Sequence, residues 1–383
     1  MKTELSAPHR RLAPLFSLVA AFALTLSLAP VAQAQVTPAA GYTPPDDTPS
    51  IKVGATIFTD FTYVNKPTSK DADGNVINPS SFNVSRSYIN ITGNVSHIVA
   101  FRITPDITRE TGTGSSLNGS LTFRLKYAFM QINLDDWLPK GSWVRLGIQQ
   151  TPLVDYEEGI YRYRFQGTTF TERETNPSGS GFLTSSDAGV SFHAAFPGNY
   201  GDVHVGFYNG EGYSKPEVND QKALQVRFTV RPVPMSPILK GWRLTAFYDA
   251  DNYVVNAERK RAVLNTTFEH QYLNVGLDYL SAYDQTSATT VPAVRDIHGK
   301  GWSVWATPKF GKGFEALLRY EGFTPDSVQT AQVRHRDILG LAYWFPHQGS
   351  VSSALMFDVD TRTFTGINSP TAQSLYVHGL IAF

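Results

Sequence analysis

Basic side chains stand at the polar positions of several alternating segments in the first half of the chain. Arg124 and Lys126 are two residues apart in LTFRLKYAFMQI, and Arg86, Arg102 and Arg145 take the corresponding positions of other segments. Side chains two residues apart in an extended strand point to the same side. A row of cations attracts anions and repels cations. We therefore expect these five residues to form a basic wall.

The longest connection between such segments, residues 151–185, carries charges of both signs. Its acidic residues are Asp155, Glu157, Glu158, Glu172 and Glu174, and its basic residues are Arg162, Arg164 and Arg173. A loop of this length in a compact domain is usually functional or disordered. It is either a solvated surface loop or a loop folded inward to narrow a pore. In the second case its acidic groups would face the basic wall and set a transverse field across the aperture.

Motifs for catalysis are weak in this sequence. The histidines lack metal-ligand spacing, and neither a G-x-S-x-G elbow nor a phosphate-binding P-loop is present. The segment DADGN hints at a calcium loop, but Val76 and Phe82 stand where that loop needs Gly and Glu. We expect no cofactor, metal or catalytic residue. A barrel-embedded hydrolase with a Ser, a His and an acid at the rim stays open as an alternative.

The elements that must position these charges are short alternating strands. About sixteen segments show apolar and polar residues in turn, and each is close to the 9 to 11 residues that cross a bilayer as a tilted strand. In LTFRLKYAFMQI, the alternation places Leu121, Phe123, Leu125, Tyr127 and Phe129 on one apolar face. Charges are costly on the lipid side of such a strand, so the basic residues should face the lumen. The fold class is all-β, an antiparallel transmembrane β-barrel with an inward-folded third loop.

The connections support this fold, because short ones alternate with long ones along the chain. Outer-membrane barrels combine short periplasmic turns with longer external loops in this order, whereas a β-sandwich has no reason to sort its loops. Further charges share the inward phase, and we expect many of them to pair across neighbouring strands. They are Arg227, Arg231, Arg243, Arg261, Arg319, Glu321 and Asp358.

The two ends of the chain indicate export. Residues 1–34 combine a basic start, an apolar stretch and the small-residue ending AQA, which predicts a cleavable signal peptide. Residues 35–50 form a Pro-rich flexible leader, and residues 51–383 form the barrel. The chain has no cysteine, and its 33 basic residues balance its 33 acidic ones, so neither a disulfide framework nor binding to nucleic acid is expected.

The chain ends on the alternating segment SLYVHGLIAF, with Phe383 as the last residue. Such a run is either an ordinary sheet strand or the last strand of a barrel, whose aromatic end lies at the membrane interface. The 18 tyrosines and 24 phenylalanines fit the aromatic girdles of a membrane barrel. We predict that this segment closes the barrel.

Several segments together resemble the phosphate-selective porin O and P family of Gram-negative bacteria. They are VRLGIQQTP, FTERE, GFYNGEGY, QVRFTVRP, GWSVWATPKF, LLRYEGF and ILGLAYWF, with the terminal Phe383. The resemblance implies a sixteen-stranded homotrimeric porin with an inward third loop, and a basic anion path formed by Arg124, Lys126, Arg145, Arg162, Arg164 and Arg173. It also implies that Phe383 serves in barrel insertion. The constriction of the phosphate-specialised members is rich in lysine, whereas this loop has balanced charge and begins acidic.

We therefore expect an outer-membrane porin, a water-filled channel for passive diffusion of small hydrophilic or anionic solutes, with phosphate among the candidates. Its partners would be such solutes, outer-membrane lipid and further copies of the chain. A structural or adhesive outer-membrane barrel without significant transport is the alternative that the sequence leaves open.

Overall fold

The computed structural model describes residues 47–112, 114–177, 179, 181–217, 219–254, 257–285, 296–328, 332–347 and 351–383. The predicted signal peptide and most of the predicted leader lie outside these residues. The barrel strands are β1 (Ser50–Lys66), β4 (Ser80–Asn94), β5 (Val99–Arg109), β6 (Leu121–Asn133), β7 (Trp143–Gln150), β8 (Ser186–Ala195), β9 (Gly201–Tyr208), β10 (Ala223–Val230), β11 (Trp242–Val254), β12 (Ala257–Glu269), β13 (Leu273–Asp284), β14 (Ile297–Gly311), β15 (Phe314–Thr324), β16 (Val333–Trp344), β17 (Ser352–Thr365) and β18 (Ala372–Ala382).

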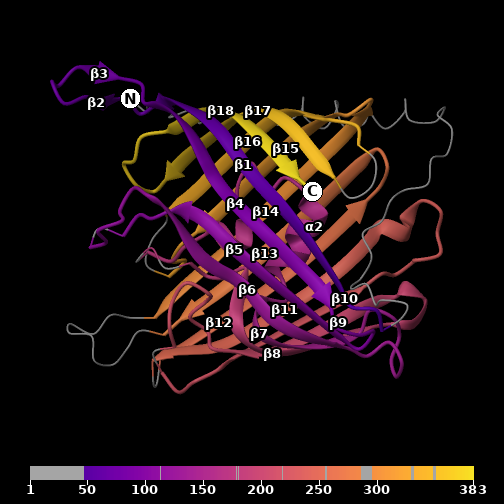
Figure 1. Ribbon diagram of the computed structural model, residues 1–383. Coiled ribbons are helices and arrows are strands. Elements are labelled where there is room, and N and C mark those ends of the chain that lie inside the picture. The colour runs from indigo at the N-terminus through magenta and orange to yellow at the C-terminus, as the bar shows by residue number, and fades with distance from the viewer. Residues whose placement is uncertain are drawn as a thin grey trace, which may run out of the picture. The chain divides into compact units, whose positions relative to one another are not determined.

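These sixteen antiparallel strands, all within the described part of the chain, form one closed barrel (Figure 1). Each strand pairs with its neighbours in sequence, and β1 pairs with β18 to complete the ring. Closure leaves no strand edge with unpaired backbone groups. The smaller elements are β2 (Ser69–Lys70), β3 (Val76–Ile77), α2 (Val154–Tyr161), α3 (Phe170–Arg173), and the 3-10 turns Pro197–Asn199 and Leu239–Gly241. The predicted fold class is confirmed.

The last residue takes part in this closure. The backbone N–H of Phe383 donates to the carbonyl of Ala55, and the N–H of Ala55 donates to the carbonyl of Phe383, both at 3.0 Å. Val377, Ile381 and the Phe383 ring lie on the outer face. The backbone of Phe383 therefore extends the β18 ladder beyond Ala382.

Alternation along the strands separates an apolar outside from a polar inside. On β6 and β7, Phe123 is 66% exposed and Leu146 is 56% exposed, whereas the intervening Arg124 and Arg145 are less exposed. Apolar side chains left exposed around a closed barrel match the surface that lipid covers in outer-membrane barrels. No helix among the described residues is long and apolar enough to cross a membrane.

The predicted apolar face of β6 is wrong beyond Leu125. The pairing of β5 with β6 shifts by one residue, because Thr104 pairs with Tyr127 and Pro105 pairs with Leu125. Lys126 is thus an extra residue in β6, and such a bulge moves the following side chains to the opposite face. Leu121, Phe123 and Leu125 face outward as predicted, whereas Tyr127 and Phe129 are buried inside the barrel.

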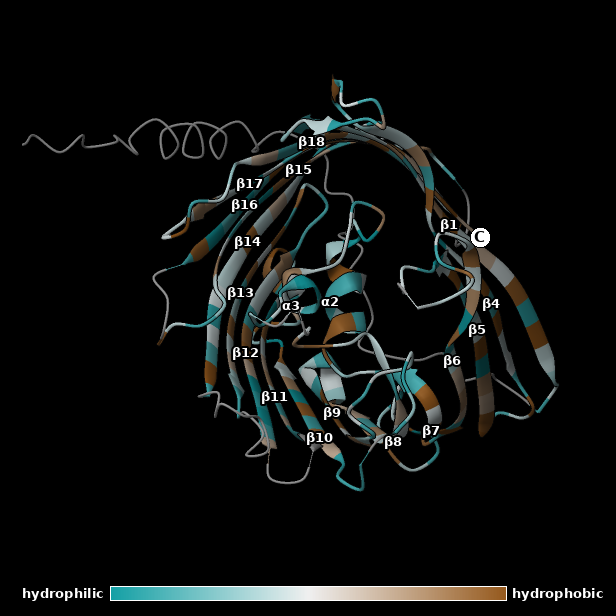
Figure 2. Ribbon diagram, turned by 90° about the vertical axis from the view of Figure 1, so that its left-hand side faces the viewer, coloured by the Kyte–Doolittle hydropathy of each residue, from teal (hydrophilic) through white to brown (hydrophobic). Residues whose placement is uncertain are grey.

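One connection also departs from the alternation of loop lengths. The strands β11 and β12 have 13 residues each, and only residues 255–256 lie between them, where a longer connection is expected. The connection between β7 and β8 is the longest one, and its helices α2 and α3 lie in the interior of the barrel (Figure 2). The prediction of an inward third loop is confirmed.

Candidate functional site

The inward loop begins with α2, whose residues divide between two sides. Val154, Glu157, Ile160 and Tyr161 are buried, whereas Asp155 is only partly covered. The helix ends at Arg162, which adopts a left-handed conformation with φ of 64°, and its backbone N–H donates to the carbonyl of Glu158 at 3.0 Å. A left-handed residue commonly ends a helix because it reverses the chain. This reversal lets the following residues pack against the same wall as α2.

Apolar residues on the inner face of the barrel hold the loop. Ile160, Tyr161, Tyr163 and Phe165 pack in one cluster with inward side chains that include Trp305, Leu317, Ile338 and Met356. A second cluster joins Leu153, Phe170 and Phe182 to Phe247, Val263, Leu280 and Phe323. Burying each large apolar side chain contributes about 1.5–3 kcal/mol. The loop is therefore packed mainly against the wall formed by β11 to β18, and its first cluster also includes Phe58 of β1 and Tyr88 of β4. The sequence patterns did not distinguish these inward apolar positions from outward ones.

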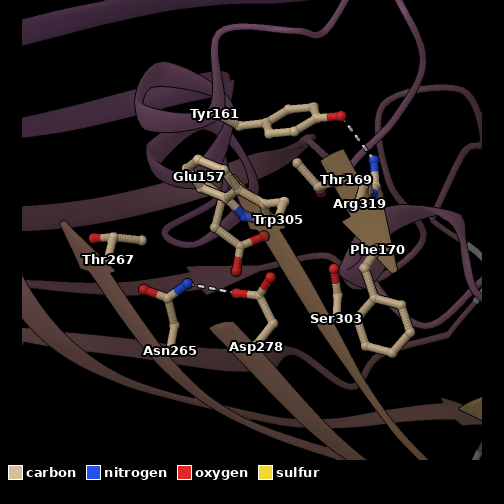
Figure 3. Close-up of a pocket in the computed structure, with 10 residues that line it drawn as sticks. All are labelled: Glu157, Tyr161, Thr169, Phe170, Asn265, Thr267, Asp278, Ser303, Trp305 and Arg319. Atoms are coloured by element: carbon tan, nitrogen blue, oxygen red, sulfur yellow. Dashed lines mark hydrogen bonds between the residues drawn. The ribbon is translucent and has the colours of Figure 1, made fainter. Parts of the chain in front are cut away.

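A buried pair of carboxyl groups lies under α2 (Figure 3). The carboxyl groups of Glu157 and Asp278 face one another in a cavity of about 10 Å³, large enough for about one water molecule. Thr171 donates to Glu157 Oε2 at 2.6 Å, and Asn265 donates to Asp278 Oδ1 at 2.5 Å. Burial, and next the charge of Asp278, raise the pKa of Glu157 well above its usual value. Glu157 is therefore part of the loop anchor and lies on the side of α2 away from the basic wall.

Polar contacts to β15 complete the anchor. Arg319 Nη1 donates to the hydroxyl of Tyr161 at 3.2 Å, and the Tyr163 hydroxyl donates to Glu315 Oε2 at 2.9 Å. Arg173 forms an ion pair with Glu321, which also pairs with Arg319. Burial, and next the charge of Arg336, lower the pKa of Arg173 to about 10 despite the Glu321 carboxylate.

The loop arginines are neutralised within the loop or on β15. Arg164 pairs with Glu158 and lies 3.8 Å from Glu172. Burial favours a lower Arg164 pKa, but these two carboxylates outweigh it and the pKa is raised. Arg162 lies 3.6 Å from Glu315, and Glu174 lies 3.1 Å from Arg173. The structure thus gives Arg162, Arg164 and Arg173 carboxylate partners and does not add them to the basic wall.

The five residues of the expected basic wall lie on the neighbouring strands β4 to β7. Arg86 pairs with the buried Asp106. The other four wall cations form no salt bridge within 4.0 Å to any residue that the structure describes; they are Arg102, Arg124, Lys126 and Arg145. These four residues are named the free cation wall below. Opposite it, Asp155 Oδ1 accepts a 3.5 Å hydrogen bond from Tyr127 of β6, so the acidic side of α2 approaches the wall.

Aromatic rings and amides hold the free cation wall in place. The Arg145 guanidinium lies 3.7 Å from the centroid of the Trp143 ring, and Arg102 lies 4.4 Å from that of Tyr127. Lys126 Nζ lies 5.0 Å from the Tyr88 centroid. Arg145 Nε also donates to Gln131 Oε1 at 2.8 Å. Cation–π contacts attract a cation without cancelling its charge. The sequence signal for this arrangement is the aromatic residues on the inner side of β4, β6 and β7, of which the predicted faces placed Tyr127 and Phe129 of β6 outward.

Glu158 lies between the loop arginine Arg164 and the free cation wall. It pairs with Arg164, and the positive charge of Lys126 also acts on it. Burial raises the pKa of Glu158, and these two cations oppose that rise. Among the described residues, no cluster of three or more His, Asp or Glu side chains is placed to hold a metal.

No protein-family model matches the chain, and no curated protein matches it. Solved structures share its fold at low identity. The anion-selective porin from Comamonas acidovorans is 13% identical, with a TM-score of 0.59, and the match covers 88% of this chain and 100% of that chain. The outer-membrane channel DcaP of Acinetobacter baumannii is 12% identical, with a TM-score of 0.56 over 90% and 100%. OmpF of Salmonella typhi, in complex with daunomycin, is 11% identical, with a TM-score of 0.57 over 87% and 97%.

The chain therefore has the fold of Gram-negative outer-membrane porins. The finer resemblance to the phosphate-selective O and P family stays a prediction.

Proposed function

We propose that this protein is an outer-membrane porin through which small hydrophilic solutes diffuse, with a preference for anions at its constriction. The observation that carries the proposal is the free cation wall opposite the acidic side of α2. Four cations there have no salt-bridge partner among the described residues, whereas the loop arginines are paired. Unpaired cations facing an aperture lower the energy of a passing anion and raise that of a cation.

The acidic residues of the loop oppose this preference only in part. Glu158 is paired with Arg164, and Glu157 is buried on the opposite side of α2. Asp155 approaches the wall through Tyr127, so it is the main carboxylate of the loop on that side. Positive charge therefore exceeds negative charge at the aperture, and the barrel wall supplies the excess.

Two further features belong to this proposal. The chain assembles as a homotrimer, which the family resemblance implies. OmpT of Vibrio cholerae, a structural neighbour with a TM-score of 0.54, is described in a trimer form. Phosphate is one candidate solute, and another neighbour is described as an anion-selective porin. The signal peptide that the sequence predicts would direct the chain to the outer membrane.

The zero-current potential of the purified protein in a planar bilayer, measured across a potassium chloride gradient, tests this function. We expect discrete conductance steps and a potential whose sign shows chloride preference. The double variant R102Q/R145Q should lose most of that preference, whereas K140Q, which removes an exposed cation in the β6–β7 turn, should keep it. Added phosphate that blocks the current would support phosphate as a solute.

Two outcomes would contradict the proposal. An absence of conductance from protein that has the mass of a folded trimer would leave a structural or adhesive barrel. An equal chloride preference in the wild type and in R102Q/R145Q would show that the free cation wall does not set selectivity.

A further inference from the structure

A second basic region lies on the wall formed by β15, β16 and β17, toward the end of the barrel with the longer loops. It surrounds an open cavity of about 360 Å³. Small-molecule sites commonly measure about 300–1,000 Å³ and combine apolar surface with a few placed polar groups. Four arginines line this cavity, Arg173, Arg334, Arg336 and Arg362, and it is called the arginine cavity below. The arginine cavity is separate from the free cation wall, which lies on β5 to β7.

We propose that the arginine cavity binds a small organic anion that carries one carboxylate and a short apolar body. The proposal rests on the porin function only for its role, which is to capture the solute before it reaches the constriction. Binding itself depends on the cavity alone.

The charges of the cavity favour an anion. Three carboxylates neutralise part of its four arginines, because Glu321 pairs with Arg173, Glu174 lies near Arg173 and Arg334, and Asp360 pairs with Arg336 and Arg362. Glu321 is also shared with Arg319 behind the cavity. Guanidinium groups therefore outnumber carboxylates here, and the excess positive charge favours an anionic ligand.

A buried donor in the cavity has no partner. Arg336 is 8% exposed, and its Nε and Nη2 atoms donate to the two oxygens of Asp360 at 2.9 and 2.6 Å. This two-pronged contact fixes the guanidinium plane. Its Nη1 atom is buried and has no hydrogen-bond partner within the described structure. Because an unpaired buried donor is costly, an acceptor oxygen from a ligand gains the hydrogen bond that the fold leaves unmade.

The remaining lining selects an organic anion over inorganic phosphate. The partly exposed Phe364 lines the cavity beside the arginines, and the buried Phe323 lies behind it. An apolar body that covers Phe364 leaves water. Arg334 and Arg362 have side chains that are 30% and 48% exposed, so they reach a carboxylate without a change in the core. Inorganic phosphate gains nothing from the phenyl ring, so its binding depends on the arginines alone.

Isothermal titration calorimetry of the purified protein in detergent tests the site, with benzoate as the probe. We expect saturable binding of benzoate and markedly weaker binding of inorganic phosphate and benzylammonium. R362Q should weaken benzoate binding about tenfold, because it removes one charge-assisted contact from an exposed position. R109Q, which removes an arginine from β5 at the same end of the barrel, should bind benzoate as the wild type does.

Two results would overturn this assignment. Unchanged benzoate binding in both R362Q and R334Q would place the ligand elsewhere, provided that both variants keep the heat-modifiable migration of a folded barrel. Equally tight binding of phosphate would remove the organic class. Benzoate binding without bilayer conductance would support the binding site and contradict the porin function. Conductance without benzoate binding would support the porin function and contradict the binding site.

Discussion

The inner surface of the barrel has two basic regions that differ in how their charges are compensated. On β9 to β17, three buried arginines have carboxylates in contact: Arg227 pairs with Asp202 at 2.6 Å, Arg261 with Asp284 at 2.5 Å, and Arg319 with Glu321. On β5 to β7, Arg102 and Arg145 contact aromatic rings and neutral amides instead. The residue type is the same in both regions, and the partners differ.

Under the proposed function, this difference separates charges that hold the fold together from charges that act on a passing solute. A buried guanidinium with a carboxylate beside it adds little net field, and removing either partner leaves an uncompensated buried charge. A guanidinium held by rings and amides keeps its full charge toward the lumen. The paired region also holds the loop, through Arg319 and Arg173, so it sets the position of α2, while the free cation wall supplies the field that α2 faces.

The largest effect is expected from breaking the paired region. In E321Q, Arg319 and Arg173 lose their shared carboxylate while buried, so the free energy of unfolding should fall by about 3–5 kcal/mol. Urea unfolding in detergent, followed by tryptophan fluorescence, measures this change. E258Q removes one partner of the exposed Lys260–Glu258 pair and should leave the unfolding midpoint unchanged. Equal midpoints for E321Q and the wild type would show that the pairing does not stabilise the fold.

A smaller effect on stability and a clear effect on selectivity are expected from R145Q. One charge in a water-filled aperture is worth about 1 kcal/mol, so the ratio of chloride to potassium permeability should fall roughly fivefold. Zero-current potentials measure this ratio, and urea unfolding should show little change because no carboxylate loses a partner. A large loss of stability with unchanged selectivity would reverse the roles assigned to the two regions.

The pH dependence of the loop gives a third comparison. The pKa of Glu157 is raised in the docked loop, so docking is fully stabilised below the usual pKa of a glutamate, about 4.3. This stabilisation declines as pH rises toward the raised value. We expect current fluctuations of the wild-type channel to increase with pH, and those of E157Q to increase less. The pKa of Glu158 is raised by a smaller amount, so E158Q should reduce the dependence less than E157Q does, and a wild-type response in E157Q would contradict this assignment.

The smallest effect is expected at the exposed turn between β4 and β5. His97 Nδ1 lies 2.6 Å from Asp47 Oδ1, and its Nε2 lies 3.0 Å from Asp136 Oδ2. These two hydrogen bonds, that to Asp47 first, raise the pKa of His97. The contact is therefore strongest below the usual histidine pKa and is lost as pH rises through the raised one. A proton NMR titration should show a lower His97 pKa in D136N, with the unfolding midpoint unchanged.

Much of this architecture follows from local sequence patterns. A closed barrel is predicted by three local patterns. They are the alternation of side chains in the strands, the alternation of short and long connections over most of the chain, and the terminal run ending at Phe383. Lipid penalises any charge that faces outward, so the polar face of each strand must face the lumen. For the same reason Arg86, Arg102, Arg124 and Arg145 were placed on the inner face from their phase alone. The length and mixed charge of residues 151–185 marked the loop that folds inward.

Strand register and packing decided what the sequence left open. The bulge at Lys126 turned Tyr127 and Phe129 inward to support the cations, and a period of two cannot reveal a one-residue shift in pairing. The partners of Arg164 and Arg173 depend on how the loop docks against inward apolar side chains of distant strands. The sequence by itself determined that charges would line the lumen, because that choice is local. Only the tertiary structure decided which of them are cancelled, because ion pairing depends on distances between groups far apart in the chain.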